Sequence, residues 1–317
     1  MKTVLFPVFI VIMVISLITY GDYRSMEIYG KKPEIIVKRE ITASVDQKLD
    51  AKKVFNSRYI NLAFLGLDKT REREETLGCF RTDTIIIMRI DLYNNNVYML
   101  SIPRDTYVFI PVINRMDKIN HAFPYGGGEK GKGFDSLIGT VESFLGIKID
   151  HYIGMDMEAI APVVDAAGGV KMDVDLDYHE NGCSLIKGQT QMLNGEMAYH
   201  YVCYRCTSRG DIDRIERQQK FLKAFLGTAN NGLSMKKAIQ IYNQFGPMIH
   251  SDMTFRQIMS LACYLKKLNP DVITGSIIEG NFMNMNGISY WNPDMQQKQI
   301  VVDRIFPESL PPSQGNN

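Results

Sequence analysis

The chain has 317 residues, of which 45% are hydrophobic, enough to bury one large core or two small ones. Its formal net charge is only +1, which argues against a dedicated nucleic-acid-binding protein, because such proteins are usually basic overall. Any site for an anion must therefore be local.

The first predicted element is an apolar segment from Thr3 to Tyr20 that contains no charged residue. As a helix it would be about 27 Å long, close to the hydrocarbon thickness of a bilayer. No small-x-small cleavage site follows, which favours a retained anchor over a cleaved signal peptide. Residues 1–21 are therefore predicted to be a membrane anchor, and the polar residues 22–57 a stalk. Basic residues on both sides of the anchor leave its orientation open.

Three buried strands are predicted after the stalk. The apolar runs "YINLAFLGLD" from Tyr59, "TDTIIIMRID" from Thr82 and "VYMLSIP" from Val97 have the length and the apolar character of buried strands. The asparagines at 94–96 predict a turn between the second and the third. Arg104 and Asp105 come directly after the third strand.

Helices follow these strands. The 3.6-residue periodicity that starts at Phe134 predicts a helix that ends at Gly146. A second is expected in "MEAIAPVVDAAGG" and a third over Ile212 to Leu226, with Asp211 as its N-cap. Two more are expected at about 234–245 and 254–268. Strands that alternate with helices predict an α/β fold, a layered α-β-α domain around a central mixed β-sheet, with its site where strands run out into loops.

The segment "YVCYRCTSRGDIDRIERQQ", residues 201–219, is rich in arginine. One interpretation is a solvated helix face with ion pairs four residues apart, from Asp213 to Arg217 and from Glu216 to Lys220. The other is a phosphate site, because the planar guanidinium fork donates two parallel hydrogen bonds to phosphate. Asp211, Arg214 and Gln218 would share one face of the helix.

Asp68 and Asp83 lie at the ends of neighbouring predicted strands. Such a pair can share Mg²⁺, which prefers one or two carboxylates together with phosphate oxygens and water; Mn²⁺ is the alternative. Simpler roles fit the same residues, since Asp68 can cap a turn and Asp83 can pair with Arg81. Arg104 can likewise pair with Asp105.

Cys203 and Cys206 have the C-x-x-C spacing of redox and zinc motifs. No second pair with ligand spacing follows, and this favours a disulfide from Cys183 to one of the two over a metal site.

In combination, the motifs resemble one known family. "NLAFLGLD", "FRTDTIIIM", "LSIPRDTYV", "DKINHAFPYGG", "GIKIDHYIGMD", "VVDAAGGVKMDV" and "GDIDRIERQQKFL" follow one another between about residues 58 and 226 as in the LytR-CpsA-Psr family of bacterial envelope enzymes. The resemblance implies a single-pass protein of the bacterial cell membrane whose catalytic domain, residues 58–310, lies outside the cytoplasm. It further implies a phosphotransferase that moves a glycopolymer phosphate from a polyprenyl-pyrophosphate carrier to a peptidoglycan hydroxyl, attaching wall teichoic acid, capsule or a similar polymer.

The resemblance also assigns residues. The carboxylates of Asp68 and Asp83 match those associated with Mg²⁺. Asp211 and Gln218 match polar residues of the last motif, and Gln218 is predicted to help bind the pyrophosphate. Basic residues that match the surroundings of the pyrophosphate are Arg81, Arg104, Lys118, Arg205 and Arg214. Among all of these, Arg104, Asp211 and Arg214 are predicted to be catalytic, with Asp211 or Asp83 helping to deprotonate the acceptor.

One departure from the family pattern concerns charge. Cys203 stands where the family usually has the first arginine of an Arg-x-Arg pair, and Arg205 is the second. The site loses one positive charge unless Arg209 replaces it. Two other functions stay open: a sensor that binds lipid-linked precursors without turnover, and a pyrophosphatase in which water replaces the acceptor.

Overall fold

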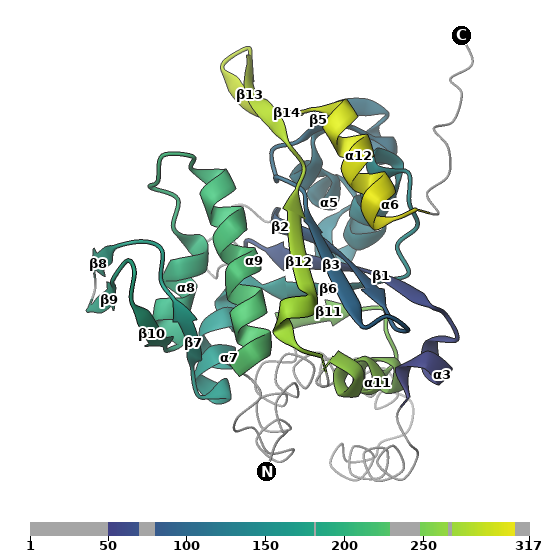
Figure 1. Cartoon of the computed structure of the whole chain (residues 1–317). Helices are drawn as coiled ribbons and strands as arrows, with labels where there is room; N and C mark the ends of the chain where they lie inside the picture. The colour runs from purple at the N-terminus through teal and green to yellow at the C-terminus, as the bar shows by residue number, and fades with distance from the viewer. Residues whose placement is uncertain (1–49, 70–79, 181, 229–247, 266–267, 308–317) are drawn as a thin grey trace, which may run out of the picture. The chain divides into compact units, whose positions relative to one another are not determined.

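The computed structural model describes residues 50–69, 80–180, 182–228, 248–265 and 268–307. They group into two compact units, whose elements are labelled in Figure 1. The first unit contains residues 50–58, 91–96 and the described part of 158–273; the second contains 59–69, 80–90, 97–157 and 274–307. The predicted anchor and most of the predicted stalk lie outside the described residues. No helix in the described ranges is long and apolar enough to cross a bilayer.

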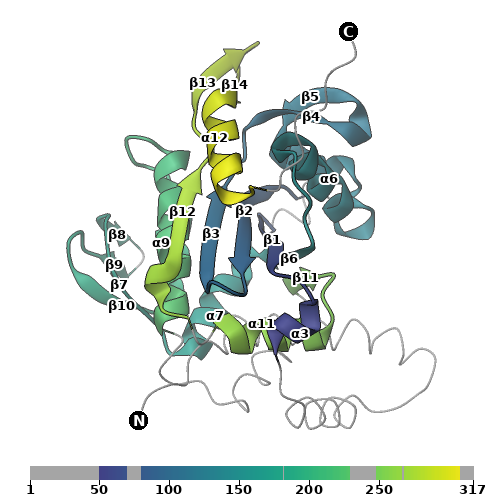
Figure 2. The ribbon, with the colours of Figure 1, turned by 45° about the vertical axis from the view of Figure 1, so that its right-hand side comes forward.

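The second unit is built on a mixed sheet whose strands follow the order β6-β1-β2-β3-β12 (Figure 2). The strands are β1 (Tyr59–Leu67), β2 (Thr82–Asp91), β3 (Asn96–Ser101), β6 (His151–Asp156) and β12 (Ile273–Ile277). β1 and β6 run parallel, with Leu62 opposite His151 and Leu67 opposite Asp156. The three strands predicted from apolar runs are confirmed as β1, β2 and β3.

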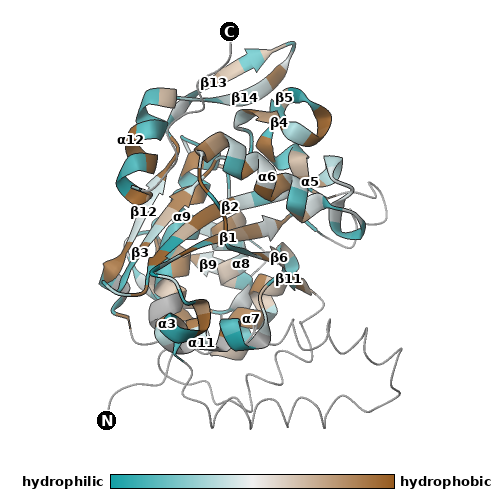
Figure 3. Ribbon diagram, turned by 90° about the vertical axis from the view of Figure 1, so that its right-hand side faces the viewer, coloured by the Kyte–Doolittle hydropathy of each residue, from teal (hydrophilic) through white to brown (hydrophobic). Residues whose placement is uncertain are grey.

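One apolar cluster of this unit packs on one face of the sheet. Every residue of β2 is buried, and Figure 3 shows hydrophobic colour along β1, β2 and β3. Alternate residues such as Leu65, Ile87 and Leu100 belong to one apolar cluster with α6 (Gly133–Leu145) and α12 (Met295–Ile305), as expected when successive side chains of a strand point to opposite faces. α6 ends at Gly146, which is left-handed with φ +70°, as predicted.

Two hairpins lie beyond this core. β4 (Tyr107–Ile110) and β5 (Arg115–Lys118) are joined through η1 (Pro111–Ile113). β13 (Gly280–Met285) and β14 (Ile288–Pro293) are joined by an Asn-Gly turn with positive φ at both positions, the geometry that suits the twist of a two-residue hairpin. Short helices follow β5: η2 (Ile119–His121), α5 (Ala122–Tyr125) and η3 (Gly128–Lys130).

The first unit is mainly helical. Its helices are α3 (Ala51–Phe55), η4 (Met157–Ala159, of which Met157 belongs to the second unit), α7 (Ile160–Ala167), α8 (Gly195–Cys203), α9 (Asp211–Thr228), α11 (Phe255–Leu265) and η7 (Pro270–Val272). Its strands are β7 (Val170–Asp173), β8 (Tyr178–Glu180), β9 (Cys183–Leu185), β10 (Thr190–Leu193) and β11 (Ile249–Ser251).

Three predicted helices correspond to elements of this unit. "MEAIAPVVDAAGG" forms η4 and α7, and α7 ends at the left-handed Gly168. The arginine-rich segment continues into α9, but Asp211 is the first residue of that helix and not the N-cap before it. α11 confirms the helix expected near 254–268. The helix expected at about 234–245 lies outside the described residues.

The prediction of an α/β fold with a central mixed sheet is therefore confirmed. The three-layer arrangement and the single domain over residues 58–310 stay predictions.

Candidate active site

Charged side chains gather at one edge of the sheet in the second unit, because four strand ends meet there. β1 and β2 are neighbours, and the amide of Asp68 donates to the carbonyl of Arg81 at 2.9 Å. The amide of Ile102, just beyond the end of β3, donates to the carbonyl of Ile85 at 2.9 Å. The segment that leads to Arg104 therefore continues beside β2. β6 runs parallel to β1 and ends at Asp156. This edge therefore carries Asp68, Asp83, Arg104 and Asp156.

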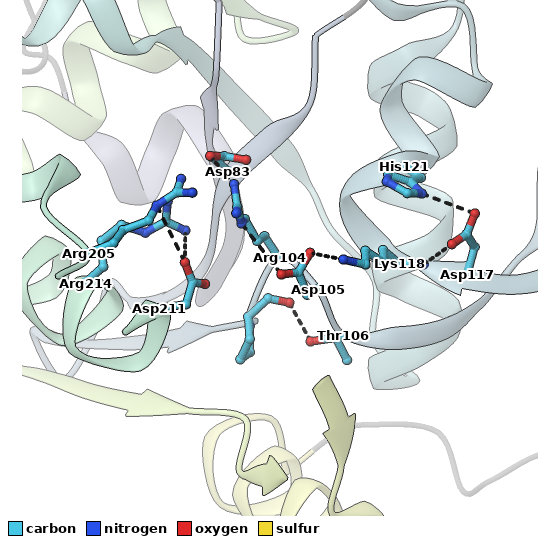
Figure 4. Close-up of polar contacts among 11 residues, drawn as sticks. Asp83, Arg104, Asp105, Thr106, Asp117, Lys118, His121, Arg205, Asp211 and Arg214 are labelled. Atoms are coloured by element: carbon cyan, nitrogen blue, oxygen red, sulfur yellow. Dashed lines mark hydrogen bonds and ion pairs between the residues drawn. The ribbon is translucent and has the colours of Figure 1, made fainter. Parts of the chain in front are cut away.

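The closest ion pair at this edge joins Arg104 and Asp83. Arg104 Nη1 donates to Asp83 Oδ2 at 2.5 Å (Figure 4). The side chain of Asp83 is 2% exposed and that of Arg104 is 21% exposed. A buried carboxylate is costly without a charged or hydrogen-bonding partner, so the pair holds the guanidinium in place. The alternative pairing of Asp83 with Arg81 is not formed as an ion pair, and Arg81 is exposed.

Asp105 connects Arg104 to Lys118. Lys118 Nζ lies 3.0 Å from Asp105 Oδ1, and Arg104 Nε lies 3.9 Å from Asp105 Oδ2. Backbone bonds fasten the two segments, because Asn120 donates to the carbonyl of Arg104 at 3.2 Å. Arg104 and Lys118, the two predicted phosphate-binding residues, are fourteen residues apart in the chain but both lie beside Asp105. Asp105, considered above only as a pairing partner, is the residue that joins them.

Sequence reasoning missed a further charged group at the same edge. Lys69 Nζ lies 2.9 Å from Glu129 Oε2 and 3.8 Å from Asp156 Oδ2. Asp156 is 4% exposed and ends a strand. The position of Asp156 at the end of the apolar run "HYIGMD" could have indicated a carboxylate at the end of a strand. Only the pairing of β6 with β1 shows that it lies opposite Leu67, next to Asp68.

The first unit holds a separate basic cluster around Asp211. Arg214 Nη2 lies 2.7 Å from Asp211 Oδ1, and Arg205 Nε lies 4.0 Å from the same oxygen (Figure 4). The Arg214 side chain is only 2% exposed, whereas that of Arg205 is 41% exposed. The structure therefore brings together three residues predicted from the arginine-rich segment, with one arginine buried and the other open to solvent.

The neighbouring residues of the arginine-rich segment have structural partners. Arg217 Nε donates to the carbonyl of Tyr201 at 3.1 Å, and its Nη2 donates to the carbonyl of Tyr204. Gln218 Nε2 donates to the carbonyl of Val202 at 3.3 Å, and the residue is 7% exposed. These bonds fasten α9 to α8 and to the segment after it. The predicted substrate-binding role of Gln218 stays a prediction.

The expected ion pairs four residues apart are not those that form. Asp213 pairs with Arg209 at 2.6 Å instead of Arg217, and Glu216 pairs with Arg209 at 2.5 Å instead of Lys220. Arg217 is committed to backbone carbonyls, and Lys220 lies 3.2 Å from Asp175. Arg209 is held by two carboxylates in this structure, and its replacement of the charge that the family pattern places at Cys203 stays a prediction.

The expected disulfide is also wrong, since Cys183, Cys203 and Cys206 are all present as thiols. Cys183 is buried in β9, whereas Cys206 is exposed after the end of α8. Burial, and then the nearby Glu196, raise the pKa of the Cys183 thiol above its usual range. A raised pKa disfavours the reactive thiolate, and Cys183 is therefore a structural cysteine.

Asp117 organises the polar contacts beside Lys118. Its Oδ2 accepts from the hydroxyl of Tyr125 at 2.8 Å and lies 3.2 Å from Nδ1 of His121. Burial by itself raises the pKa of Asp117, but the Tyr125 hydroxyl, the Lys118 amide and His121 outweigh it and lower the pKa below its usual range. Asp117 is therefore ionised at neutral pH.

A pH dependence of stability follows from this lowered pKa. The carboxylate stabilises the folded state at pH values above its unfolded pKa, about 3.9, and this contribution is lost as the pH falls through the lower folded pKa. We expect Asp117→Asn to lower the free energy of unfolding by about 1–2 kcal/mol at pH 7, with the difference shrinking in acid. Urea titrations at several pH values measure this. A difference that stays constant with pH would contradict the assignment, and Tyr125→Phe should show a smaller effect of the same sign.

The arrangement provides arginine and lysine beside carboxylates at one sheet edge of the second unit, and a buried arginine with an acidic partner in the first. Such groups suit the neutralisation and positioning of phosphate oxygens. Asp68 and Asp83 are oxygen donors on adjoining strand ends, as a hard divalent cation requires.

Known proteins resemble this chain in sequence. A family model described as the LytR_cpsA_psr family matches residues 26–305. A relative from Oceanobacillus iheyensis, named polyisoprenyl-teichoic acid--peptidoglycan teichoic acid transferase TagU, is 33% identical over 270 residues, which cover 83% of this chain and 82% of the relative. The TagU of Bacillus subtilis is 29% identical over 235 residues, 74% of this chain and 72% of that protein.

Solved structures of related proteins share the fold. The structure described as TagT bound to LIIa-WTA has a TM-score of 0.65 and 25% identity, covering 83% of this chain and 94% of that one. The structure of Bacillus subtilis TagV has a TM-score of 0.66 and 26% identity, covering 80% of this chain and 99% of that one.

Proposed function

The chain belongs to the LytR_cpsA_psr family, and we propose that it transfers a glycopolymer phosphate from a polyprenyl-pyrophosphate carrier to a hydroxyl of peptidoglycan. The names of the TagU relatives support teichoic acid as the polymer. The observation that carries the proposal is the Arg104–Asp83 pair, with Asp105 and Lys118 beside it. A guanidinium fixed in position by Asp83 suits the stabilisation of charge that develops during a reaction. A sensor that only binds its ligand has less need of such a fixed group.

In the proposed reaction the acceptor hydroxyl attacks the phosphorus next to the glycan. The bond from that phosphorus to the bridging oxygen breaks, polyprenyl phosphate leaves with the electron pair, and a phosphodiester to peptidoglycan forms. The hydroxyl proton passes to a carboxylate, for which Asp211 is the candidate, because Asp83 uses one oxygen for Arg104 and offers the other to the metal. The main need in such a transfer is positioning and charge neutralisation.

Arg104 and Lys118 are proposed to bind phosphate oxygens from the sheet edge of the second unit. Arg205 and Arg214 of the first unit are proposed to bind phosphate as well. The buried guanidinium of Arg214 is held by Asp211 at 2.7 Å, so it cannot reorient freely and is already placed before substrate binds. Arg81 is exposed, and we keep it as a phosphate ligand in the proposal.

The carboxylates of Asp68 and Asp83 fit Mg²⁺ in number and chemistry, because the ion takes one or two carboxylates and completes its shell with phosphate oxygens and water. Asp83 already uses Oδ2 for Arg104, and its second oxygen is the donor proposed for the metal. When bound, Mg²⁺ supplies further positive charge to the phosphates; Mn²⁺ is the alternative ion. The N-terminal anchor over residues 1–21 and a catalytic domain outside the cytoplasm are part of the same proposal.

Removal of divalent cations tests the metal. We expect EDTA to abolish transfer and Mg²⁺ to restore it, because the phosphates then lack a neutralising cation. Asp68→Asn should raise the Mg²⁺ concentration for half-maximal rate by about tenfold or more, measured in a titration of rate against Mg²⁺. Asp117→Asn, outside the proposed donor set, should leave that concentration unchanged. Full activity in EDTA would contradict the metal.

The function itself is tested with the full chain in detergent, a polyprenyl-pyrophosphate glycan and a peptidoglycan oligomer, with products followed by mass spectrometry. A glycan phosphate on the oligomer supports the transferase. Release of polyprenyl phosphate without an adduct would instead indicate a pyrophosphatase. Lipid binding without any product would indicate a sensor.

A further inference from the structure

The two hairpins of the second unit expose apolar side chains. On β4 and β5, Phe109 lies directly opposite Met116 in the strand register, and the two are 44% and 43% exposed. On β13 and β14, Ile288 lies opposite Met285 and is 48% exposed. Directly opposed residues of an antiparallel pair share a face, so each hairpin presents an apolar pair on one face.

These faces join into one surface. Tyr107 shares the face of Phe109 on β4, and Tyr290 shares the face of Ile288 on β14. The rings of Tyr107 and Tyr290 meet edge to face with centroids 5.1 Å apart, and Thr106 forms a bridge with Trp291. Figures 1 and 2 show the β13–β14 hairpin extending beyond the rest of the unit. We call this the two-hairpin surface; it consists of Tyr107, Phe109, Met116, Met285, Ile288 and Tyr290.

The two-hairpin surface adjoins the Arg104 cluster. Lys118 Nζ lies 5.4 Å from the ring centroid of Tyr290 and 3.0 Å from Asp105 Oδ1. The amide of Trp291 donates to the carbonyl of Asp105 at 2.9 Å. The apolar surface is thus continuous with the residues proposed to bind the diphosphate, which in a lipid-linked substrate lies at the level of the headgroups.

We propose that the two-hairpin surface contacts the lipid bilayer at the boundary between headgroups and acyl chains. The proposal rests on the proposed function, since a lipid-linked diphosphate held by Arg104 and Lys118 brings the adjoining surface to the membrane.

The distribution of side chains favours lipid over a protein partner. Phe282 is 63% exposed and packs edge to face on Trp291, with centroids 5.1 Å apart. It lies on the face of β13 opposite to that of Met285, because the two residues are three positions apart. A flat protein surface can cover one face of a projecting hairpin, whereas lipid surrounds both.

The same hairpin limits the depth of insertion. β13 and β14 form a two-stranded sheet, so its outer backbone groups need water or headgroups as partners. The turn carries the polar Asn286. The geometry therefore fits a shallow, interfacial contact and excludes a segment that crosses the hydrocarbon.

The chain contains a single tryptophan, Trp291, which lies under Phe282 and serves as a native reporter. The full chain is reconstituted into vesicles of phosphatidylglycerol and phosphatidylcholine, with or without bromine on the acyl chains. Bromine quenches tryptophan only at short range, so we expect weaker Trp291 emission in the brominated vesicles. Equal emission in both would overturn the proposal.

Variants locate the contact. The double change Phe109→Ser and Ile288→Ser removes two exposed apolar side chains of the two-hairpin surface, and it should abolish most of the difference between the two vesicle types. Ile300→Ser on α12, where the side chain is 58% exposed, is the matched control and should preserve the difference. Circular dichroism checks that each variant folds. Quenching that the double variant leaves unchanged would overturn the assignment to this surface.

Two further outcomes are informative. If Trp291 emission is the same with and without bromine but changes with protein concentration, a second copy of the chain covers this surface. That result would overturn the lipid proposal. The assay contains no glycan substrate, so failure of transfer leaves the quenching result intact, and loss of quenching in an active enzyme refutes only the membrane contact.

Discussion

Replacing Arg104 by alanine is expected to lower the rate of transfer about 100- to 1000-fold, the range for removing one preorganised donor to developing charge. The same change removes the arginine whose Nη1 lies 2.5 Å from Asp83 Oδ2. Because the Asp83 side chain is only 2% exposed, its carboxylate would be left buried without this partner. Breaking such a pair costs about 3 kcal/mol of folding stability. The rate is measured at saturating substrate, and the stability is measured by urea unfolding.

The two effects must be separated, and the chain offers a matched control. Arg89 is a buried arginine on β2, stacked on Tyr59 with its guanidinium 3.7 Å from the ring centroid. Arg89→Ala should destabilise the protein while the folded enzyme keeps its turnover. The double change Asp83→Asn with Arg104→Ala should recover stability without activity. If Arg104→Ala loses stability but retains turnover once folded, Arg104 has no part in the chemistry.

Arg214→Ala is expected to have an effect of similar size on transfer, about 100- to 1000-fold. Arg214 is 1% exposed and pairs with Asp211 at 2.7 Å, so it presents its charge in a low-dielectric surrounding, where charge interactions are strong. Arg214→Lys should recover little activity, because a lysine ammonium cannot reproduce the two-pronged donation of the guanidinium. Rates at saturating substrate, compared with wild type, give the loss of transition-state stabilisation.

Arg217 provides the contrast on the same helix. Its guanidinium donates to the carbonyls of Tyr201 and Tyr204, so Arg217→Ala should lower stability with little change in the turnover of folded enzyme. The reverse result, with Arg217→Ala inactive and Arg214→Ala active, would exchange their roles. Asp211→Asn completes the series: loss of turnover with intact Mg²⁺ affinity supports Asp211 as the proton acceptor, and unchanged turnover removes it.

Local elements were predicted well from the sequence. The three apolar runs became β1, β2 and β3, and the helix from about Phe134 to Gly146 became α6, because strand and helix periodicities depend on residues close together in the chain. The boundary at Asp211 was misplaced by one residue, which is within the usual uncertainty of helix ends.

Partner choice was predicted poorly. Asp213 and Glu216 form ion pairs with Arg209, and not with the residues four positions further along the same helix. Arg217 donates to backbone carbonyls instead. A spacing rule says which side chains can meet, and the surrounding tertiary contacts decide which do. The expected disulfide of Cys183 is also not formed, and C-x-x-C spacing by itself does not determine the separation and direction of backbones that a disulfide needs.

By itself, the sequence determined the α/β class, the order of the strands and helices along the chain and, through its ordered motifs, the family and the candidate residues. Only the tertiary structure decided that Asp105 bridges Arg104 and Lys118, that Asp156 joins the edge beside Asp68, and that two hairpins form one exposed apolar surface. The physical reason is range. Periodicity and motifs record interactions within a few residues, whereas the pairing of β1 with β6 and of Tyr107 with Tyr290 depends on packing between segments far apart in the chain.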